Sequence, residues 1–372
     1  MKTLVIGGGM SGLTYGILSA QKGNDTVIFE RNSRVGKKIA MTGNGKCNIG
    51  NVNSNESCFN TCKTVSSVLK AVPVERYVQF LQSCGIFTFA DSEGRMYPLC
   101  ESASNVVDCL RKRYADVGGK TVCDADVQSV RRLKNGFEVT CNGSQHLFDK
   151  VVVACGSGSG CADVHLAQLV GQQYLTPLFP SLVPLRTVKM DKSLSGLRVK
   201  ANVRLLSDGE CLAQQSGEVQ FKEYGLSGIC IFNLSSTVAR RKCKGNFVIC
   251  LDVVPHLSLQ QLQKVLASRI GWQEKSFYGI LHNKLGEYVV KHSDGTPQGM
   301  AQTAKNLSFA VERPLDFSMS QVTSGGVSEK FLDENLTLPN GLTVIGEALD
   351  VDGICGGNNL YFAAASALYL FR

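Results

Sequence analysis

Hydrophobic and polar positions follow strand and helix patterns in turn at both ends of the chain. Thr3 to Ile6 is a short apolar run rich in β-branched residues, typical of a buried parallel strand, and Thr26 to Phe29 is a second such run. Between them, apolar side chains recur at helical spacing. Near the other end, Leu342 to Ile345 has the strand pattern and Leu360 to Leu370 is apolar all round, as in a buried helix. These patterns predict an α/β fold whose parallel sheet receives strands from both ends.

The segments between the two ends predict further elements. Thr64 to Cys84 predicts two helices, with Pro73 starting the second, and Ser102 to Val117 predicts another. Gly85 to Pro98 has the alternation and the turn residues of a hairpin. Thr121 to Cys155 predicts a small β-meander and then an apolar strand that returns to the parallel sheet.

The pattern changes after Pro184. Arg186 to Val254 alternates apolar and polar residues between turns, which predicts an inserted β domain. Leu257 to Ala310 has a helical pattern with few prolines and predicts a small helical cap. The chain then returns to strand and loop at Gln321 to Val327.

A glycine motif joins the first strand to the first helix. Gly7 permits a tight turn, Gly9 lets the backbone approach a pyrophosphate, and Gly12 allows close packing of helix on strand. The helix N-terminus can then hold phosphates through free N–H groups. Glu30, at the end of the second strand, is placed to accept hydrogen bonds from the ribose hydroxyls. Strand, glycines, helix, strand and acid in this order predict dinucleotide binding rather than a glycine-rich turn without function.

A second glycine-rich turn, Gly156 to Gly160, also follows a strand and precedes a predicted helix, Ala162 to Val170. It offers an alternative site for NAD(P)H. No strand ending in an acid follows that helix, however, so we expect a single bound dinucleotide with this turn closing over it.

The last helix begins after a glycine-rich block, Gly353 to Asn359. One helix N-terminus at the start of the chain and another at its far end suggest a ligand with two ends, and FAD fits. Its ADP half would lie on Gly7 to Gly12, and its isoalloxazine would reach the last helix, whose N–H groups would stabilise negative charge on the reduced ring. The alternative is that the block is an ordinary loop and helix cap.

Charge and cysteine content add limited information. The net charge is +8, and basic residues cluster at 111–113, 131–132 and 240–244; such clusters suit solvated faces or an anionic partner such as RNA. The fifteen cysteines lack disulfide-framework and CxxC spacing, which predicts reduced thiols in the cytoplasm. The first strand begins directly after Met1, and the longest apolar run is too short for a bilayer, so we expect no signal peptide and no membrane association. No metal site is predicted.

Several long motifs carry a resemblance to a known family. The loop Gly36 to Asn51, which reads GKKIAMTGNGKCNIGN, resembles the G(R/K)K…TGNGRCN-x-x-N loop of a bacterial flavoprotein family. That family includes a bile-acid dehydroxylation reductase, an aminoacetone oxidase and a ribosomal-RNA dihydrouridine synthase. The other similar segments are Gly94 to Pro98, Pro180 to Leu185, Gly217 to Gly228, Ser320 to Val327 and Gly346 to Leu360.

The resemblance implies three structural parts. Residues 1–183 and 312–372 would form a Rossmann-like FAD-binding domain, residues 184–255 an inserted β-barrel-like domain, and residues 256–311 a small helical domain. It also implies FAD contacts at matching positions. These are Gly7, Gly9, Met10, Ser11, Gly12, Glu30, Arg31, Lys38, Asn44, Gly45, Lys46, Cys47, Asn48, Val127, Ala154, Cys155, Gly156, Gly346, Glu347, Asp352, Gly356, Gly357, Asn358, Asn359 and Leu360.

Four positions depart from the family pattern. In the family turn ATGG, Cys155 and Ser157 replace the threonine and the last glycine, and the family loop that follows is contracted, so contacts on the adenosine side are less constrained. Lys222 stands at a family threonine and Asn358 at a common tyrosine, and we expect both near the substrate. These departures bear on the substrate and leave the FAD assignment intact.

The resemblance implies an FAD-dependent oxidoreductase in which NAD(P)H reduces the flavin and an electron-poor C=C bond accepts hydride. Candidate proton donors are Lys222, Glu223 and Tyr224, with Asp350 and Asp352 beside the flavin block, although each also suits a structural role. Cys47 is interpreted as loop packing because no resolving cysteine accompanies it.

Three alternatives stay open. One is an amine oxidase that produces H₂O₂, another is a ribosomal-RNA uridine reductase, and a third is flavin binding without catalysis. The partner is accordingly a small molecule or ribosomal RNA, and the sequence leaves the substrate and the oligomeric state open.

Overall fold

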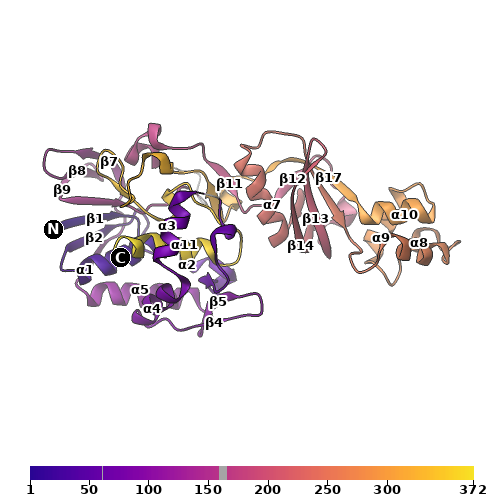
Figure 1. Cartoon of the computed structure of the whole chain (residues 1–372), viewed down its shortest axis with the longest axis horizontal. Coiled ribbons are helices and arrows are strands. Elements are labelled where there is room, and N and C mark those ends of the chain that lie inside the picture. Colours follow the sequence, from indigo (N-terminus) through magenta and orange to yellow (C-terminus); the bar gives the residue numbers. More distant parts are fainter. Residues whose placement is uncertain (61, 159–165) are drawn as a thin grey trace. The chain divides into compact units, whose positions relative to one another are not determined.

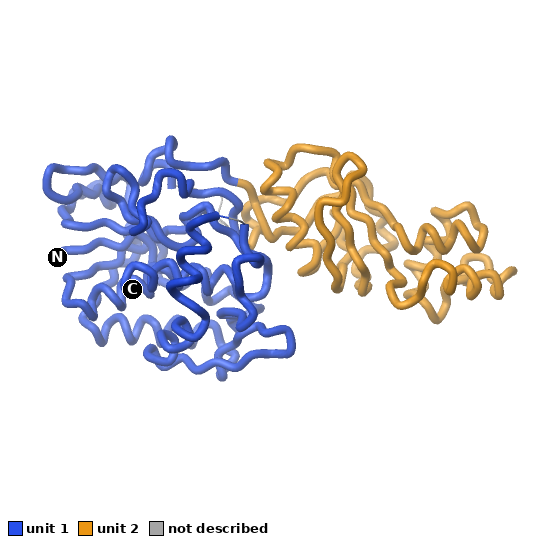
Figure 2. Tube along the Cα trace, viewed as in Figure 1, with its two compact units in different colours: residues 1–178, 322–372 blue, residues 179–321 orange. Residues whose placement is uncertain are grey.

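The computed structural model describes residues 1–60, 62–158 and 166–372 (Figure 1). The chain forms two compact units, coloured separately in Figure 2. Unit 1 comprises Met1–Leu178 and Val322–Arg372, and unit 2 comprises Phe179–Gln321. Each unit has its own core of buried apolar side chains. The predicted separation of the barrel and the helical segment into two domains stays a prediction.

Unit 1 is built on a five-stranded sheet in which every neighbouring pair is parallel. Val5, in the middle of the central strand, lies opposite Ile28 on one side and Val152 on the other, and its side chain is buried. The order is β19-β10-β1-β2-β6, with β1 Lys2–Ile6, β2 Asp25–Phe29, β6 Lys120–Val122, β10 Lys150–Val153 and β19 Thr343–Val344. Both chain ends supply strands, so the predicted α/β fold is confirmed.

Helices cover this sheet where the sequence pattern places them. Figure 1 shows α1 and α5 on one side of the sheet and the meander β7-β8-β9 on the other. The helices of unit 1 are α1 Met10–Gln21, α2 Lys37–Ala40, α3 Lys63–Ala71, α4 Val74–Ser83, α5 Ala103–Asp116, α6 Leu166–Val170 and α11 Asn358–Tyr369. The predicted helix over 162–170 begins outside the described residues and is observed from Leu166 onward.

Two small antiparallel sheets complete unit 1. The order β3-β5-β4 contains the predicted hairpin, and β7-β8-β9 is the predicted meander. Their bounds are β3 Gly50–Asn51, β4 Thr88–Ala90, β5 Arg95–Pro98, β7 Val127–Arg132, β8 Phe137–Cys141 and β9 Ser144–Phe148. Strand β18, Val322–Ser324, also belongs to unit 1 and lies in neither of these sheets.

Unit 2 contains a closed barrel of order β12-β15-β14-β13-β16-β17. Along β13, buried Ala201, Val203 and Leu205 alternate with exposed polar residues, which is the period-two pattern of a strand with one face in a core. The bounds are β11 Phe179–Ser181, β12 Leu185–Thr187, β13 Arg198–Ser207, β14 Glu210–Lys222, β15 Gly225–Ser227, β16 Phe247–Asp252 and β17 Leu307–Pro314. The prediction of a barrel-like domain is confirmed.

Two details of the predicted unit 2 are wrong. The stretch predicted as all β contains α7, Ile229–Arg240, which buries Ile231, Leu234 and Val238 at helical spacing on the barrel core. The segment predicted as helical as far as Ala310 becomes strand at Leu307, because β17 closes the barrel between β16 and β12. Both errors arise because short β-branched and serine-rich stretches fit either period.

The helical segment precedes β17. It consists of α8 Leu259–Ala267, α9 Asn283–Lys291 and α10 Pro297–Lys305, which lie at one end of the barrel while α7 lies at the other (Figure 1). Among the described residues, no helix has the length and apolarity that crossing a membrane requires.

Charge is distributed unequally between the units. Unit 2 contains eighteen Lys and Arg against eleven Asp and Glu, a net charge of +7, so unit 1 carries only +1 of the total of +8. The basic cluster at 240–244, at the C-terminal end of α7, contributes to this excess.

Candidate functional site

The turn between β1 and α1 has the geometry that its three glycines predict. Gly7 has φ +105°, and a Cβ there would lie 2.6 Å from the carbonyl oxygen of Ala154. A Cβ on Gly12 would lie 1.9 Å from the carbonyl oxygen of Gly7, so only glycine lets the helix pack this closely. Gly9, the N-cap of α1, has open space where its Cβ would point. The turn therefore offers a ligand an unobstructed approach to a helix N-terminus.

Glu30 holds this turn from the end of β2. One carboxylate oxygen accepts the Gly8 N–H at 2.9 Å, and the other accepts the backbone and side-chain N–H groups of Asn32 at 2.9 and 2.6 Å. The side chain is 8 % exposed. The oxygen that accepts from Gly8 has one further lone-pair site, so Glu30 can fix the loop and still accept a bond from a ribose hydroxyl.

Gly346, at the start of the C-terminal family segment Gly346 to Leu360, lies directly beside α1. Gly346 has φ +69°, and a Cβ there would lie 2.4 Å from the Ser11 hydroxyl. Its N–H donates to Ser366 of α11 at 2.9 Å. Next to it, Glu347 pairs with Lys38 at 2.5 Å and accepts the Thr323 N–H at 3.0 Å. Residues from opposite ends of the sequence thus meet at the start of α1.

The loop before α11 is shaped by its own asparagines. Asn359 accepts the Gly353 N–H and donates to the Gly353 carbonyl, both at 2.8 Å. Asn358 is 2 % exposed; its amide donates to the Ile354 carbonyl at 3.2 Å and accepts from the Ser54 hydroxyl at 2.8 Å. Both side chains therefore bond within the protein. The amide of Asn358 is thus not open to a substrate, whereas its position at a family tyrosine led us to expect it near the substrate.

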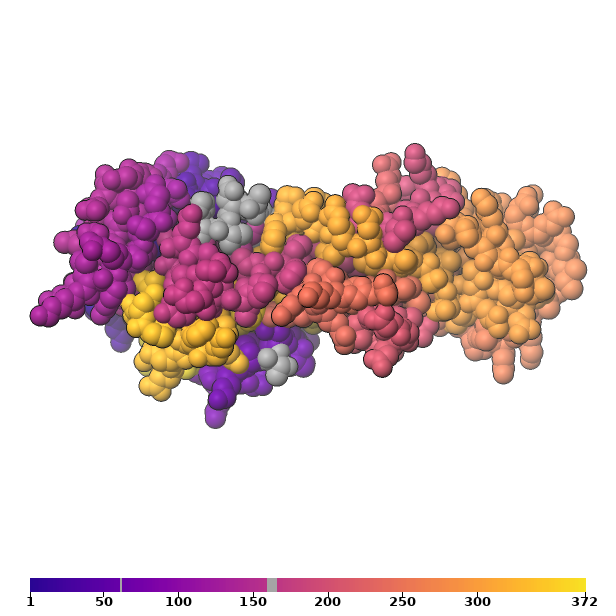
Figure 3. Space-filling view, turned by 90° about the horizontal axis from the view of Figure 1, so that it is seen from above, coloured from indigo at the N-terminus to yellow at the C-terminus, as the bar shows by residue number. Residues whose placement is uncertain are grey.

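A segment from early in the chain lies along this loop. Asn60 exchanges hydrogen bonds with the backbone of Asp352 at 3.0 and 2.9 Å, and Phe59 forms an isolated bridge with Gly353. Asn51 donates to the Gly356 carbonyl at 3.2 Å. In Figure 3 the C-terminal atoms of unit 1, in yellow, lie beside purple atoms of this early segment. Sequence reasoning did not place Asn51 and Asn60 among the site residues; the available signals are the final asparagine of the family motif, at Asn51, and the asparagine-rich stretch 51–60.

The other expected cofactor contacts lie around these two loops. Asn44 has φ +52°, and Asn44, Gly45, Lys46 and Arg31 are exposed. Lys46 pairs with Glu101 at 3.2 Å. Ala154 is buried under Gly7, Gly156 lies near Glu347, and Val127 begins β7. Whether these residues contact FAD stays a prediction.

Two polar groups of this region are buried. Burial raises the pKa of the Cys47 thiol to about 11, so at neutral pH it is a protonated packing group, in line with the expected structural role. Ser157 is 1 % exposed, and its hydroxyl has no hydrogen-bond partner among the described residues.

The candidate proton donors lie in unit 2, at the turn between β14 and β15. Lys222 ends β14, Glu223 is exposed, and the Tyr224 carbonyl accepts the Thr187 N–H at 3.1 Å. Burial raises the pKa of the Tyr224 phenol, which keeps it protonated at neutral pH. A Cβ on Gly225 would lie 2.2 Å from the Leu185 carbonyl, so the barrel itself requires that glycine. Catalysis by these three side chains stays a prediction.

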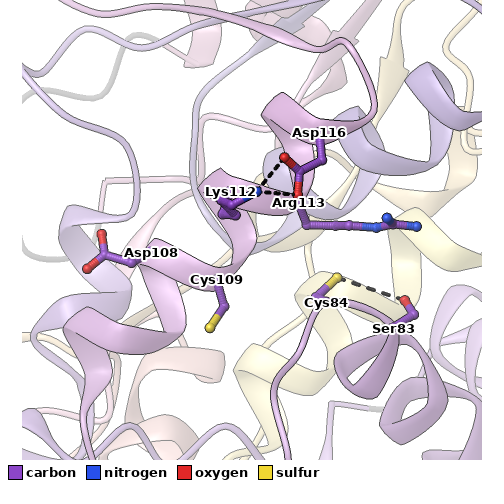
Figure 4. A pocket seen from close by; sticks show the side chains of 7 residues that line it. All are labelled: Ser83, Cys84, Asp108, Cys109, Lys112, Arg113 and Asp116. Carbon is purple, nitrogen blue, oxygen red and sulfur yellow. Dashed lines mark hydrogen bonds and ion pairs between the residues drawn. The ribbon is translucent and has the colours of Figure 1, made fainter.

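A depression of about 400 Å³ lies elsewhere on unit 1, between α5 and the end of α4 (Figure 4). None of the predicted site residues lines it. Lys112 bonds Asp116 at 2.6 Å one turn along α5, while the Nε of Arg113 is buried without a hydrogen-bond partner among the described residues. Its lining residues are Ser83, Cys84, Asp108, Cys109, Lys112, Arg113 and Asp116.

Comparisons with known proteins agree with this geometry. The chain is 29% identical over 394 residues to a 3-dehydro-bile acid delta(4,6)-reductase of Clostridium scindens, covering 97% of this chain and 96% of the relative. It is 24% identical over 397 residues to a ribosomal RNA dihydrouridine synthase of Haemophilus influenzae, covering 98% and 96%. A flavocytochrome c3 fumarate reductase in its open conformation aligns over 99% of this chain and 77% of that chain, with TM-score 0.48 and 13% identity.

The residues present fit FAD: an open glycine turn at one helix start, a buried acid beside it, and a second glycine block against the same helix. The protein is an FAD-dependent oxidoreductase with a Rossmann-type cofactor domain, as the sequence predicts. The model of the family described as HI0933-like protein Rossmann domain matches residues 1–370, and the chain belongs to that family.

Proposed function

We propose that the protein reduces an electron-poor C=C bond of a small-molecule acceptor, with NAD(P)H as the diffusible reductant. Bound FAD would supply the hydride chemistry, taking hydride from NAD(P)H and passing it to the acceptor. The choice of reaction is supported by the reductase of Clostridium scindens, whose name describes the reduction of double bonds in a 3-dehydro bile acid and which aligns over nearly its whole length.

The observation that carries the cofactor part of the proposal is that α1 and α11 both begin after a glycine and that Gly346, from the far end of the chain, lies against α1. The N-terminus of α1 would bind the pyrophosphate through its free N–H groups, and the N-terminus of α11 would stabilise negative charge at the ring. Both helices begin after a glycine, with no side-chain cap and no acidic residue in the first turn. Neither helix N-terminus carries a capping or acidic side chain that would compete with an electron-rich ligand for the backbone N–H groups.

Reduction of a C=C bond also needs a proton. We propose that Tyr224, Glu223 or Lys222 supplies it, and Tyr224 is tested first because a phenol carries its proton at neutral pH and can be removed without changing the ring. A Tyr224→Phe variant should then retain flavin reduction by NAD(P)H and lose acceptor turnover. Loss of both steps, or of neither, would reject Tyr224 as the donor.

The test is anaerobic. The purified protein is reduced with NADH or NADPH while the flavin absorbance is followed, and a conjugated enone is then added. Reoxidation by the enone with one equivalent of saturated product supports the proposal. In a separate aerobic assay, rapid H₂O₂ formation with an amine and negligible NAD(P)H consumption would instead support the amine oxidase alternative.

A second candidate function is reduction of a uridine in ribosomal RNA. Two observations favour it: the relative in Haemophilus influenzae bears that name, and unit 2 concentrates a net charge of +7, which suits a phosphate backbone. Deleting the gene should then remove dihydrouridine from ribosomal RNA, measured by mass spectrometry. Unchanged ribosomal RNA modification would reject this candidate function and would not bear on the proposed reduction of a small-molecule C=C bond.

We also propose a cytoplasmic location. Every cysteine that the structure describes is free, including the exposed Cys100, Cys211 and Cys243. Exposed free thiols persist where glutathione and thioredoxin keep them reduced.

A further inference from the structure

The peptide group that joins Gly356 to Gly357 is held at both of its polar ends. Asn51 donates from Nδ2 to the Gly356 carbonyl at 3.2 Å. In the amide orientation that satisfies both ends of Asn48, its oxygen accepts the Gly357 N–H at 3.2 Å and its nitrogen donates to the Gly50 carbonyl at 3.0 Å. The carbonyl and the N–H belong to one peptide group, so two asparagines from early in the chain fix its orientation.

This peptide group is one that would otherwise rotate. Gly356 and Gly357 have φ +115° and +94°, a region that glycine enters without steric cost. Glycine cannot be replaced by a stiffer residue at 357, because a Cβ there would lie 2.2 Å from the Gly50 carbonyl oxygen. The orientation must therefore be set by hydrogen bonds, and residues 48 and 51 provide them.

The orientation matters because the peptide immediately precedes α11. With its carbonyl bonded to Asn51 and its N–H to Asn48, this peptide presents neither group elsewhere. The polar groups left at the start of α11 are then the first-turn N–H groups, since no side chain caps this helix. A peptide turned away from these two asparagines would leave its carbonyl oxygen, the negative end of a dipole, free to lie beside those first-turn N–H groups.

We propose that Asn51 and Asn48 are positioning residues for the flavin: by locking the Gly356–Gly357 peptide they keep the start of α11 purely hydrogen-bond donating. This favours the reduced, electron-rich cofactor over the oxidised one. The inference rests on the assignment of the α11 N-terminus to the FAD ring in the proposed function. Asn51 is absent from the cofactor contacts that the family resemblance implies, and it acts here through the peptide.

The experiment compares variants at position 51 in the FAD-loaded protein. Asn51→Asp keeps an oxygen for the Asn53 N–H, which Asn51 accepts at 2.8 Å, and removes only the donor to Gly356. Asn51→Ala removes both bonds. Asn53→Ala and Asn53→Asp are the matched controls, because Asn53 is exposed, lies in the same loop, and its aspartate adds the same charge.

Two readouts are taken. The midpoint potential of bound FAD gives the ratio of the affinities for reduced and oxidised cofactor, and hydrogen exchange followed by mass spectrometry reports on the segment 353–361. Loss of one hydrogen bond to the peptide should lower that affinity ratio by roughly tenfold in Asn51→Ala and at least as much in Asn51→Asp. Both variants should exchange faster at 353–361, and both controls should match the wild type.

Each outcome has a distinct meaning. If FAD gives the wild-type segment 353–361 no protection, the assignment of α11 to the ring fails and the inference fails with it. If FAD protects the segment but both variants at 51 keep the wild-type affinity ratio, the assignment stands and the locking role is rejected. If Asn53→Asp shifts the ratio as much as Asn51→Asp, the effect is one of charge, which also rejects it.

Discussion

The helices of this protein begin in two ways. Helices α8 and α10 begin with hydroxyl caps: Ser258 accepts the Gln261 N–H within a full capping box, and Thr296 accepts the Gly299 N–H. Helices α1 and α11 begin after Gly9 and Gly357 with no side-chain cap. A missing cap costs a helix about 1 kcal/mol. At α1 and α11 a bound ligand would satisfy these N–H groups, whereas α3 and α4 also begin without a side-chain cap and no ligand is expected there.

An uncapped start alone does not mark a site. Helix α7 also begins after a glycine without a side-chain cap, but a Cβ on Gly228 would lie 2.3 Å from the Glu218 carbonyl, so barrel packing explains that glycine. What distinguishes α1 is the open space at Gly9 together with Gly346, from the far end of the chain, beside it. Five substitutions or conditions test whether the two kinds of start differ as this comparison implies.

The largest effect is expected from Gly12→Ala. The added Cβ would lie 1.9 Å from the Gly7 carbonyl oxygen, so α1 must move away from the turn that precedes it. We expect loss of bound FAD and a free energy of unfolding lower by about 3 kcal/mol. Urea unfolding and the flavin absorbance of the purified protein measure the two effects. Full FAD content in this variant would contradict the proposed packing role.

Gly9→Ala should separate cofactor binding from stability. No atom lies within 4 Å of the place its Cβ would take, so the apo protein should keep its free energy of unfolding within about 0.5 kcal/mol. The same methyl group would occupy the space that a pyrophosphate needs, so FAD affinity should fall by about a hundredfold. Calorimetric FAD titration and apo-protein unfolding test this, with Gly12→Ala as the variant that loses both. Unchanged FAD affinity would show that the pyrophosphate does not bind at this turn.

The Glu30→Gln variant tests whether the structure of the glycine turn depends on the buried carboxylate of Glu30. Both carboxylate oxygens accept N–H groups, from Gly8 and from Asn32, so the amide end of a glutamine must face a donor. Leaving that donor unpaired should cost about 2 kcal/mol of stability and weaken FAD binding about tenfold. Glu75→Gln is the control, because Glu75 is an exposed acid of α4. Equal behaviour of the two variants would show that Glu30 does not organise the turn.

Much of this architecture follows from local rules. The strand runs, the glycine turn and Glu30 were predictable because each role is set by spacing within about thirty residues. The parallel sheet and the buried last helix follow from hydrophobic pattern alone. The resemblance to the family adds the C-terminal block, which no local rule connects to the first helix.

The remainder depends on partners far apart in the sequence. Asn51 and Gly356 meet across 305 positions, and nothing in the spacing of either residue reveals it. The side chains of Asn358 and Asn359 turn into their own loop, which only the loop's path determines. Likewise β17 is a strand because it pairs with both β16 and β12 and so closes the barrel, which its local hydrophobic pattern does not predict.

Alkaline pH should affect the region around the start of α11 through Cys47, whose neighbour Asn48 contacts Gly357. Burial raises the pKa of Cys47 from 9.0 to about 11. The folded state therefore disfavours the thiolate: the contribution to stability is complete below pH 9 and is lost as pH rises towards 11. Between pH 8 and 10 the wild type should lose about 1.4 kcal/mol more than Cys47→Ala, measured by urea unfolding. Parallel pH profiles of the two proteins would exclude this thiol as the cause.

Ser258→Ala should give the smallest effect. It tests α8, a helix whose N-terminus has a side-chain cap. It removes the hydroxyl that accepts the Gln261 N–H at 3.2 Å, so the free energy of unfolding should fall by about 1 kcal/mol. FAD affinity should not change, because α8 belongs to unit 2 and no cofactor contact is expected there. Gly9→Ala predicts the reverse: affinity lost and stability kept. If Ser258→Ala weakens FAD binding, a helix start of the capped kind also contributes to the cofactor, and the division between the two kinds of start does not hold.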